Sequence, residues 1–165
     1  MALNASTTVP FSLPEVAAVL VNEDFVRHVS ELVGGSLEEF TVDGDTSAAF
    51  TATVVRTVPT TRLPDIARKV VGETLTVTQR EAWTAPETDG SRQADIQVSI
   101  AGAPVSAKAV QKLVSVDGQT RIDVEGEVTS SIPFLGGKIA GAAEPMVGKA
   151  LNLQAQQVQS WLESH

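Results

Sequence analysis

Glu81 is the residue of this chain whose type and position best fit a chemical role. Leu75, Val77, Gln79, Glu81 and Trp83 alternate with polar residues, which predicts a strand with these five side chains on one face. A carboxyl group on the wall of an apolar cavity has a raised pKa and can act as a general acid or base, or orient a ligand hydroxyl. The alternative is a bulge or a sheet edge that turns Glu81 outward, because an unpaired buried carboxylate is costly.

Three other ionisable residues bear on this prediction. Lys112 either extends into solvent or pairs with Glu81. His28 lies one position away from the apolar stripe of a predicted helix, which favours a surface or boundary histidine over a catalytic one. His165 ends the sequence and is expected to be disordered. Apart from Glu81 as a weak candidate, we therefore predict no catalytic residue.

The composition excludes several kinds of site. The chain has no cysteine and two histidines, too few for a zinc site or for thiol chemistry. The pairs Gly34–Gly35 and Gly136–Gly137 lack the frame of a phosphate-binding loop, and Ser130–Ser131 lacks that of a nucleophile elbow. Asp43–Gly44–Asp45 is best interpreted as a turn. We expect neither a cofactor nor a metal.

Charge and hydrophobicity limit the partners. With 12 Lys and Arg against 20 Asp and Glu, the net charge is −8 and there is no basic run, which argues against nucleic-acid binding. No segment approaches the ~20 apolar residues of a membrane span, and the N-terminus has no signal-peptide pattern. We expect a cytoplasmic protein with a single domain over residues 1–165, of 42% hydrophobic residues. The oligomeric state is left open.

The elements that must position these residues follow from the hydrophobic period. Ser12 and Glu15 form a capping-box pattern before one short helix, and Asn22 can cap a second, which Gly34–Gly35 ends. Asp117–Gly118 predicts a hairpin turn. Strands are predicted over 2–10, 37–42, 47–58, 74–83, 94–100, 105–116 and 122–128, a short helical segment over 63–71 and a long helix over 137–163 with Pro145 inside it.

This order of elements resembles the helix-grip fold of the START-like (SRPBCC, Bet v 1-like) superfamily. The stretches Leu63-Pro64-Asp65-Ile66 and Ile132-Pro133-Phe134-Leu135-Gly136-Gly137-Lys138-Ile139 are similar to those of an actinobacterial domain-of-unknown-function family. The resemblance implies an α+β fold in which a curved antiparallel sheet of about seven strands wraps around the C-terminal helix. Two short helices follow the first strand. It also implies a hydrophobic cavity between sheet and helix, which in that superfamily holds lipids, sterols or polyketides.

Small residues on the predicted inner surface favour such a cavity, because interiors otherwise pack to high density. The small residues are Ala48, Ala52, Ala94, Thr120, Gly126, Ala142 and Ala143. The residues predicted to line the cavity are Phe50, Ala52, Gln79, Glu81, Trp83, Ile96, Val98, Ile122, Val124, Met146, Ala150 and Leu153. The alternative is a flatter sheet with the helix seated closely on it.

The leading functional hypothesis is therefore non-catalytic binding of a small apolar molecule, such as a lipid, an isoprenoid or a polyketide-like compound. A cyclase or hydrolase that uses Glu81 as acid or base is the first alternative. The second is a protein-interaction module without a ligand, which predicts a large exposed apolar patch.

Overall fold

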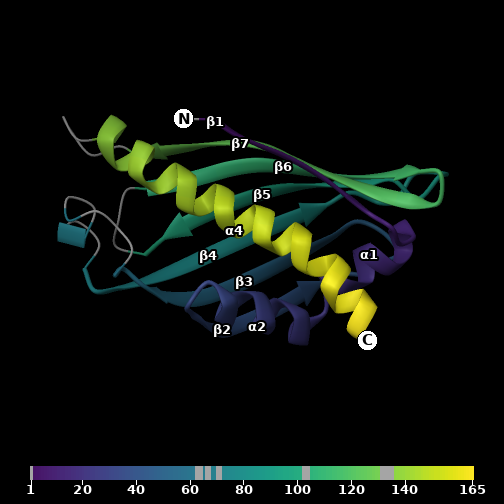
Figure 1. The fold of residues 1–165 in the computed structure, drawn as a ribbon, viewed down its shortest axis with the longest axis horizontal. Coiled ribbons are helices and arrows are strands. Elements are labelled where there is room, and N and C mark those ends of the chain that lie inside the picture. Colours follow the sequence, from purple (N-terminus) through teal and green to yellow (C-terminus); the bar gives the residue numbers. More distant parts are fainter. Residues whose placement is uncertain (1, 62–64, 66–67, 70–71, 102–104, 131–135) are drawn as a thin grey trace.

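The protein is an antiparallel sheet with three helices, as described by a computed structural model for residues 2–165 except 62–64, 66–67, 70–71, 102–104 and 131–135 (Figure 1). The elements are β1 (Ala2–Val9), α1 (Leu13–Leu20), α2 (Glu23–Leu32), β2 (Ser36–Asp43), β3 (Phe50–Pro59), β4 (Thr74–Trp83), β5 (Arg92–Ile100), β6 (Val105–Val116), β7 (Gln119–Ser130) and α4 (Gly136–Ser164). The predicted helical segment at 63–71 lies largely outside the described residues.

The sheet has seven strands in the order β1-β7-β6-β5-β4-β3-β2. Each strand from β2 to β6 pairs with the next along the chain, and β1 completes the sheet by pairing with β7. The β6–β7 connection is the predicted two-residue hairpin, with positive φ at Asp117 and Gly118. This topology confirms the expected order of the sheet.

One face of this sheet is buried because successive strand residues point to opposite sides. Along β4, for example, Gln79, Glu81 and Trp83 are buried and the intervening Arg80 and Ala82 are exposed. The other central strands alternate in the same way. The buried face lies toward α4, which crosses it in Figure 1.

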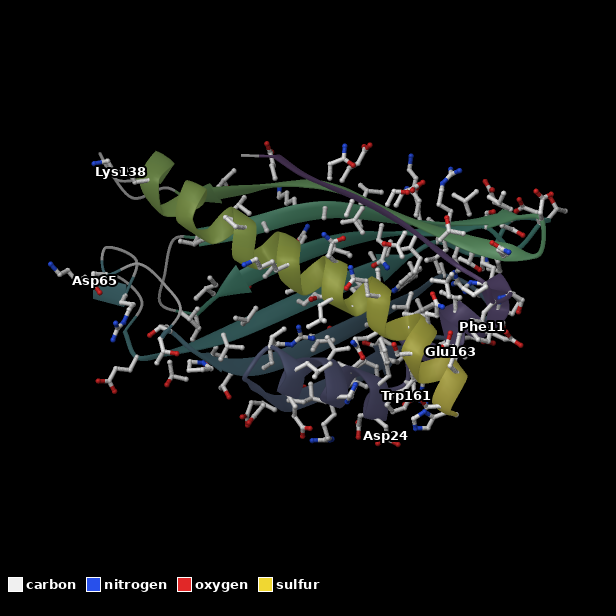
Figure 2. All side chains as sticks on the ribbon, in the orientation of Figure 1. Phe11, Asp24, Asp65, Lys138, Trp161 and Glu163 are labelled. Atoms are coloured by element: carbon white, nitrogen blue, oxygen red, sulfur yellow. The ribbon has the colours of Figure 1, made fainter. Side chains whose placement is uncertain are left out.

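The helices close one end of the molecule. The carboxyl-terminal half of α4 lies near α1 and α2 (Figure 1), and α4 contacts the sheet mainly at β7 and β1. Figure 2 places Trp161 of α4 at the same end as Asp24 of α2, and Asp65 and Lys138 at the opposite end. Trp161 packs edge-on against Phe25, at 5.6 Å between ring centroids. The concave face is thus sealed by apolar packing at the α1–α2 end.

Local details confirm some predictions and correct others. The Asn22 side chain accepts a hydrogen bond from the Phe25 amide, as expected of a cap. Ser12 occupies the N-cap of α1, but its side chain makes no capping hydrogen bond, so the capping box is wrong. Ala48 lies exposed before β3, which begins at Phe50 and not at 47.

The long helix predicted over 137–163 is confirmed as α4, which continues through Pro145. The last residue differs from the prediction. His165, expected to be disordered, stacks on Trp161 at 3.9 Å between ring centroids, and its Nδ1 donates a 2.9 Å hydrogen bond to the Trp161 carbonyl oxygen. Because that carbonyl oxygen is an acceptor, Nδ1 of His165 must carry the proton in this contact.

Candidate functional site

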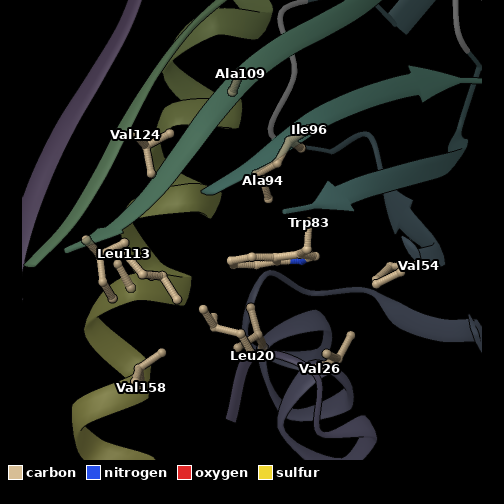
Figure 3. Packing of buried hydrophobic residues seen from close by; sticks show 14 of the residues in the cluster. Leu20, Val26, Val54, Trp83, Ala94, Ile96, Ala109, Leu113, Val124 and Val158 are labelled. Atoms are coloured by element: carbon tan, nitrogen blue, oxygen red, sulfur yellow. The ribbon is translucent and has the colours of Figure 1, made fainter. Parts of the chain in front are cut away.

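The predicted lining residues of the sheet lie on its one buried face. Strand register aligns Phe50 with Trp83, and it aligns Ala52 with Glu81 and Glu81 with Ile96. Around Trp83, apolar side chains of α1, α2, β3 and β5 meet in the closely packed region of Figure 3. The predicted residues on this face are Phe50, Ala52, Gln79, Glu81, Trp83, Ile96, Val98, Ile122 and Val124.

The helix residues of the predicted site are less enclosed. Ala150 and Leu153 of α4 are half-buried, and the side chain of Met146 lies outside the described residues. Gln157, one turn after Leu153, contacts His28 of α2 at 3.3 Å. This contact shows that the part of α4 that carries Gln157 lies against α2.

Glu81 is held by its two neighbours on the same face of β4. The Gln79 amide donates from Nε2 to Oε2 of Glu81 at 2.5 Å, and the Trp83 indole donates from Nε1 to Oε1 at 3.0 Å. Alternate residues of a strand share a face, so this spacing lets one carboxyl group accept from both neighbours. The strand itself therefore fixes the orientation of Glu81.

Burial makes Glu81 a weaker acid than an exposed glutamate. The residue is 3% exposed. Desolvation raises its pKa above the ordinary 4.5, and the hydrogen bonds from Trp83 and Gln79, with the charge of Arg56, offset only part of that rise. The alternative in which a bulge turns Glu81 outward is wrong, because β3–β4 pairing is regular through this position. Lys112 does not pair with Glu81, because it lies exposed on the other face of β6.

Arg56 is a second charged residue on the concave face, and the sequence analysis missed it. It is 8% exposed and electrostatically coupled to Glu81. Burial lowers the pKa of the Arg56 guanidinium, an effect that Glu81 opposes. The sequence signal was present, since Arg56 continues the alternation of Phe50, Ala52 and Val54 along β3.

Arg92 closes the site at the Trp83 end and was also missed. Its guanidinium donates to the backbone carbonyl oxygens of Thr46, Ala48 and Thr84 at 2.8–3.2 Å. It also lies 5.1 Å from the ring centroid of Phe50 and 5.7 Å from that of Trp83, within range of cation–π attraction. Arg92 thereby joins the β2–β3 loop to the ends of β4 and β5.

The concave face is more open at its other end. Val77, Val98 and Ile100 are half-buried, whereas Ala94 and Ile96, nearer to Trp83, are 0% and 1% exposed. The polar residues extend from the closed region into the half-buried one, because Glu81 pairs with Ile96, Gln79 with Val98 and Arg56 with Val77. The arrangement is a hydrogen-bonding cluster bordered on one side by closed core and on the other by partly accessible apolar surface.

His28 is a boundary residue of α2, as predicted. It is half-buried, contacts Gln157 and lies 5.7 Å from Trp161 between ring centroids. No group of three or more potential ligand residues within the described ranges is arranged to hold a metal ion. None of the helices in those ranges is both long and apolar enough to span a membrane.

The opposite, convex face carries an open depression of about 620 Å³ over β5, β6 and β7. Its rim includes Asp95, Lys108, Glu125 and Glu127, which point away from the core. Of the large hydrophobic residues described, Leu32 and Val116 are the exposed ones. These two lie on α2 and at the β6–β7 turn, so they do not form the apolar patch that a protein-interaction module predicts.

The family model described as "Protein of unknown function (DUF2505)" matches residues 4–162. Two similar curated proteins are Uncharacterized protein Rv0481c of Mycobacterium tuberculosis and Uncharacterized protein Mb0491c of Mycobacterium bovis. Each is 26% identical over 134 residues, which cover 79% of this chain and 76% of the relative.

Solved structures with little sequence identity share the fold over nearly the whole chain. An uncharacterized protein from Rhizobium leguminosarum matches with a TM-score of 0.64 at 9% identity, covering 100% of this chain and 95% of that one. Ara h 8.0201 matches with a TM-score of 0.58 at 13% identity, covering 100% and 99%. Norcoclaurine synthase from Thalictrum flavum, in complex with dopamine and hydroxybenzaldehyde, matches with a TM-score of 0.55 at 13% identity, covering 100% and 87%. These matches confirm the Bet v 1-like helix-grip fold.

Proposed function

This chain belongs to the family "Protein of unknown function (DUF2505)", and we propose that it binds a small, mainly apolar molecule between the concave face of its sheet and α4, without transforming it. The ligand class is that of lipids, isoprenoids or polyketide-like compounds. The observation that carries the proposal is the hydrogen-bonded group of Gln79, Glu81 and Trp83 on a buried sheet face whose core is mainly apolar. Ligand sites combine such an apolar lining with a few fixed polar groups that orient the bound molecule.

Two further observations support this function. The half-buried side chains of Val98 and Ile100 leave apolar surface next to the polar group, and burying it under a ligand yields about 25 cal/mol per Å². In addition, the norcoclaurine synthase structure, which shares the fold, holds two small aromatic molecules.

The test is native mass spectrometry of the purified protein, followed by binding of the neutral dye Nile red. We expect either a co-purifying molecule that leaves on denaturation, or a saturable blue shift of the dye emission. Val98→Trp should weaken dye binding by filling the accessible surface. Gln97→Trp is the matched control, because Gln97 is the preceding residue of β5 and is exposed on the other face.

The outcomes separate clearly. An apo mass together with no dye binding would overturn the proposed function. Equal effects of the two tryptophan substitutions on a folded protein would place binding elsewhere. Because a large side chain in β5 can impair folding, Ala150→Trp on α4, with the exposed Asn152→Trp as control, provides a second pair.

An enzyme with Glu81 as general acid is the second candidate, favoured by the burial that raises the Glu81 pKa. The hydrogen bonds from Gln79 and Trp83 equally suit a purely orienting role. Glu81→Gln distinguishes the two, because it abolishes proton transfer and preserves most of the shape. Turnover of any bound molecule by the wild type, lost in Glu81→Gln, would favour the enzyme.

A further inference from the structure

Arg56 is a buried cation without a hydrogen-bond partner in the described part of the chain. It is 8% exposed, and its Nε atom is enclosed and unpartnered. Buried charges are normally paired, because an unpaired one costs several kcal/mol. Arg92 on the same face illustrates the usual outcome, since its guanidinium donates to three backbone carbonyl oxygens.

Glu81 does not satisfy the hydrogen-bonding needs of Arg56. Arg56 and Glu81 do not form an ion pair within 4.0 Å. The three ion pairs among the described residues involve other side chains, all at the surface. Both carboxyl oxygens of Glu81 already accept a hydrogen bond, from Gln79 and from Trp83. The guanidinium therefore retains donors that another acceptor can fill.

The surroundings of Arg56 indicate what that acceptor is attached to. Register places Arg56 beside Val77 and Val77 beside Ile100, and Gln79 beside Val98. Val77, Val98 and Ile100 are half-buried apolar side chains. A molecule that reaches the guanidinium along this surface thus needs an anionic head and an apolar body.

We propose that Arg56 binds the carboxylate of an amphipathic ligand whose hydrocarbon part lies along Val77, Val98 and Ile100. This inference rests on the proposed function and specifies its ligand class. The guanidinium fork matches a carboxylate with two parallel hydrogen bonds. Arg56 is the buried cation with an unpartnered donor among the described residues. One such cation, with Glu81 close enough to interact with it, favours a monoanionic head over a dianionic phosphate.

The test is calorimetric titration with straight-chain carboxylates of ten to sixteen carbons and the alcohols of equal length. The wild type should bind the best carboxylate at least about tenfold more tightly than the matched alcohol, as expected for a charge-assisted hydrogen bond in a buried site. Arg56→Met should remove that preference and change alcohol affinity less than about twofold. Arg80→Met is the control, because Arg80 is exposed on the opposite face of β4.

Thermal unfolding without ligand adds a second readout. If Arg56 serves a ligand, Arg56→Met should melt at the wild-type temperature or above, because an apolar side chain replaces an unpaired buried charge. A Met variant that is destabilised and keeps its carboxylate preference would overturn the inference. Equal binding of acids and alcohols by the wild type would overturn it and leave the proposed function standing. Binding of neither, together with no dye binding, would overturn both.

Discussion

The indole N–H of Trp83 donates a 3.0 Å hydrogen bond to Glu81, two residues earlier on the same strand. Gln79 holds the other carboxyl oxygen from the opposite direction along β4. The geometry of Glu81 is thus set by the period of the strand and does not require α4 to be in contact with it. Gln79 and Trp83 thereby fix the carboxyl group in one orientation on the buried face of the sheet.

The first prediction concerns the pH dependence of stability. Burial raises the Glu81 pKa in the folded protein. The folded protein therefore keeps the Glu81 proton at pH values above 4.5, where the unfolded chain loses it. The Glu81 contribution to stability is therefore present at low pH and is lost as pH rises from 4.5 through the folded pKa. Glu81→Gln should remove this loss and be more stable than the wild type at neutral pH.

Urea unfolding at a series of pH values from 4 to 8 measures this difference. Each unit of pKa displacement corresponds to about 1.4 kcal/mol. Glu125→Gln, at an exposed position of β7, is the control and should parallel the wild type. Parallel profiles for Glu81→Gln and the wild type would show that Glu81 ionises equally in both states.

The second prediction concerns Arg92 as the clamp of the closed end. Lysine keeps the charge but cannot reach three carbonyl oxygens with a planar fork. Arg92→Lys should cost about 2 kcal/mol, which lowers the melting temperature by roughly 4–8 °C. Arg80→Lys, on the exposed face of β4, should leave it unchanged. Calorimetric melting of both variants checks this, and equal melting temperatures would contradict it.

The strand pattern made the concave face predictable, because alternation over 74–83 identifies which side each residue of β4 takes. The inward position of Glu81 was harder to predict, because burying a carboxyl group is costly without hydrogen-bond donors. The donors are the Gln79 and Trp83 side chains, and their contacts with Glu81 are visible only in three dimensions. Arg56 was missed because an arginine within a strand pattern is usually exposed. Arg92 was missed because its partners are backbone carbonyl oxygens, which no side-chain motif encodes.

The third prediction concerns Gly126, where strands β6 and β7 approach closely. A Cβ at this position would lie 2.3 Å from the carbonyl oxygen of Lys108 and 2.7 Å from the Cα of Ala109. Both are backbone atoms in the paired strand, so the sheet itself must move. Gly126→Ala should cost about 2 kcal/mol or more in urea unfolding.

Gly118 provides the control for that experiment. It has a φ of +78° and open space around it, and asparagine tolerates this conformation. Gly118→Asn should therefore lose less than about 1 kcal/mol. A Gly126→Ala variant as stable as Gly118→Asn would mean that the sheet relaxes freely at the β6–β7 contact.

The last prediction orders the interactions that hold down the Glu81 pKa. The hydrogen bond from Trp83 lowers it most, then the bond from Gln79, then the charge of Arg56. Trp83→Phe, Gln79→Leu and Arg56→Met should therefore each raise the Glu81 pKa above the wild-type value, in decreasing order. Carboxyl ¹³C NMR of glutamate-labelled protein follows this titration directly, with Glu125→Gln as the unaffected reference. A fall in the Glu81 pKa in any of the three variants would contradict the arrangement, because each substitution removes a group that stabilises the ionised carboxylate.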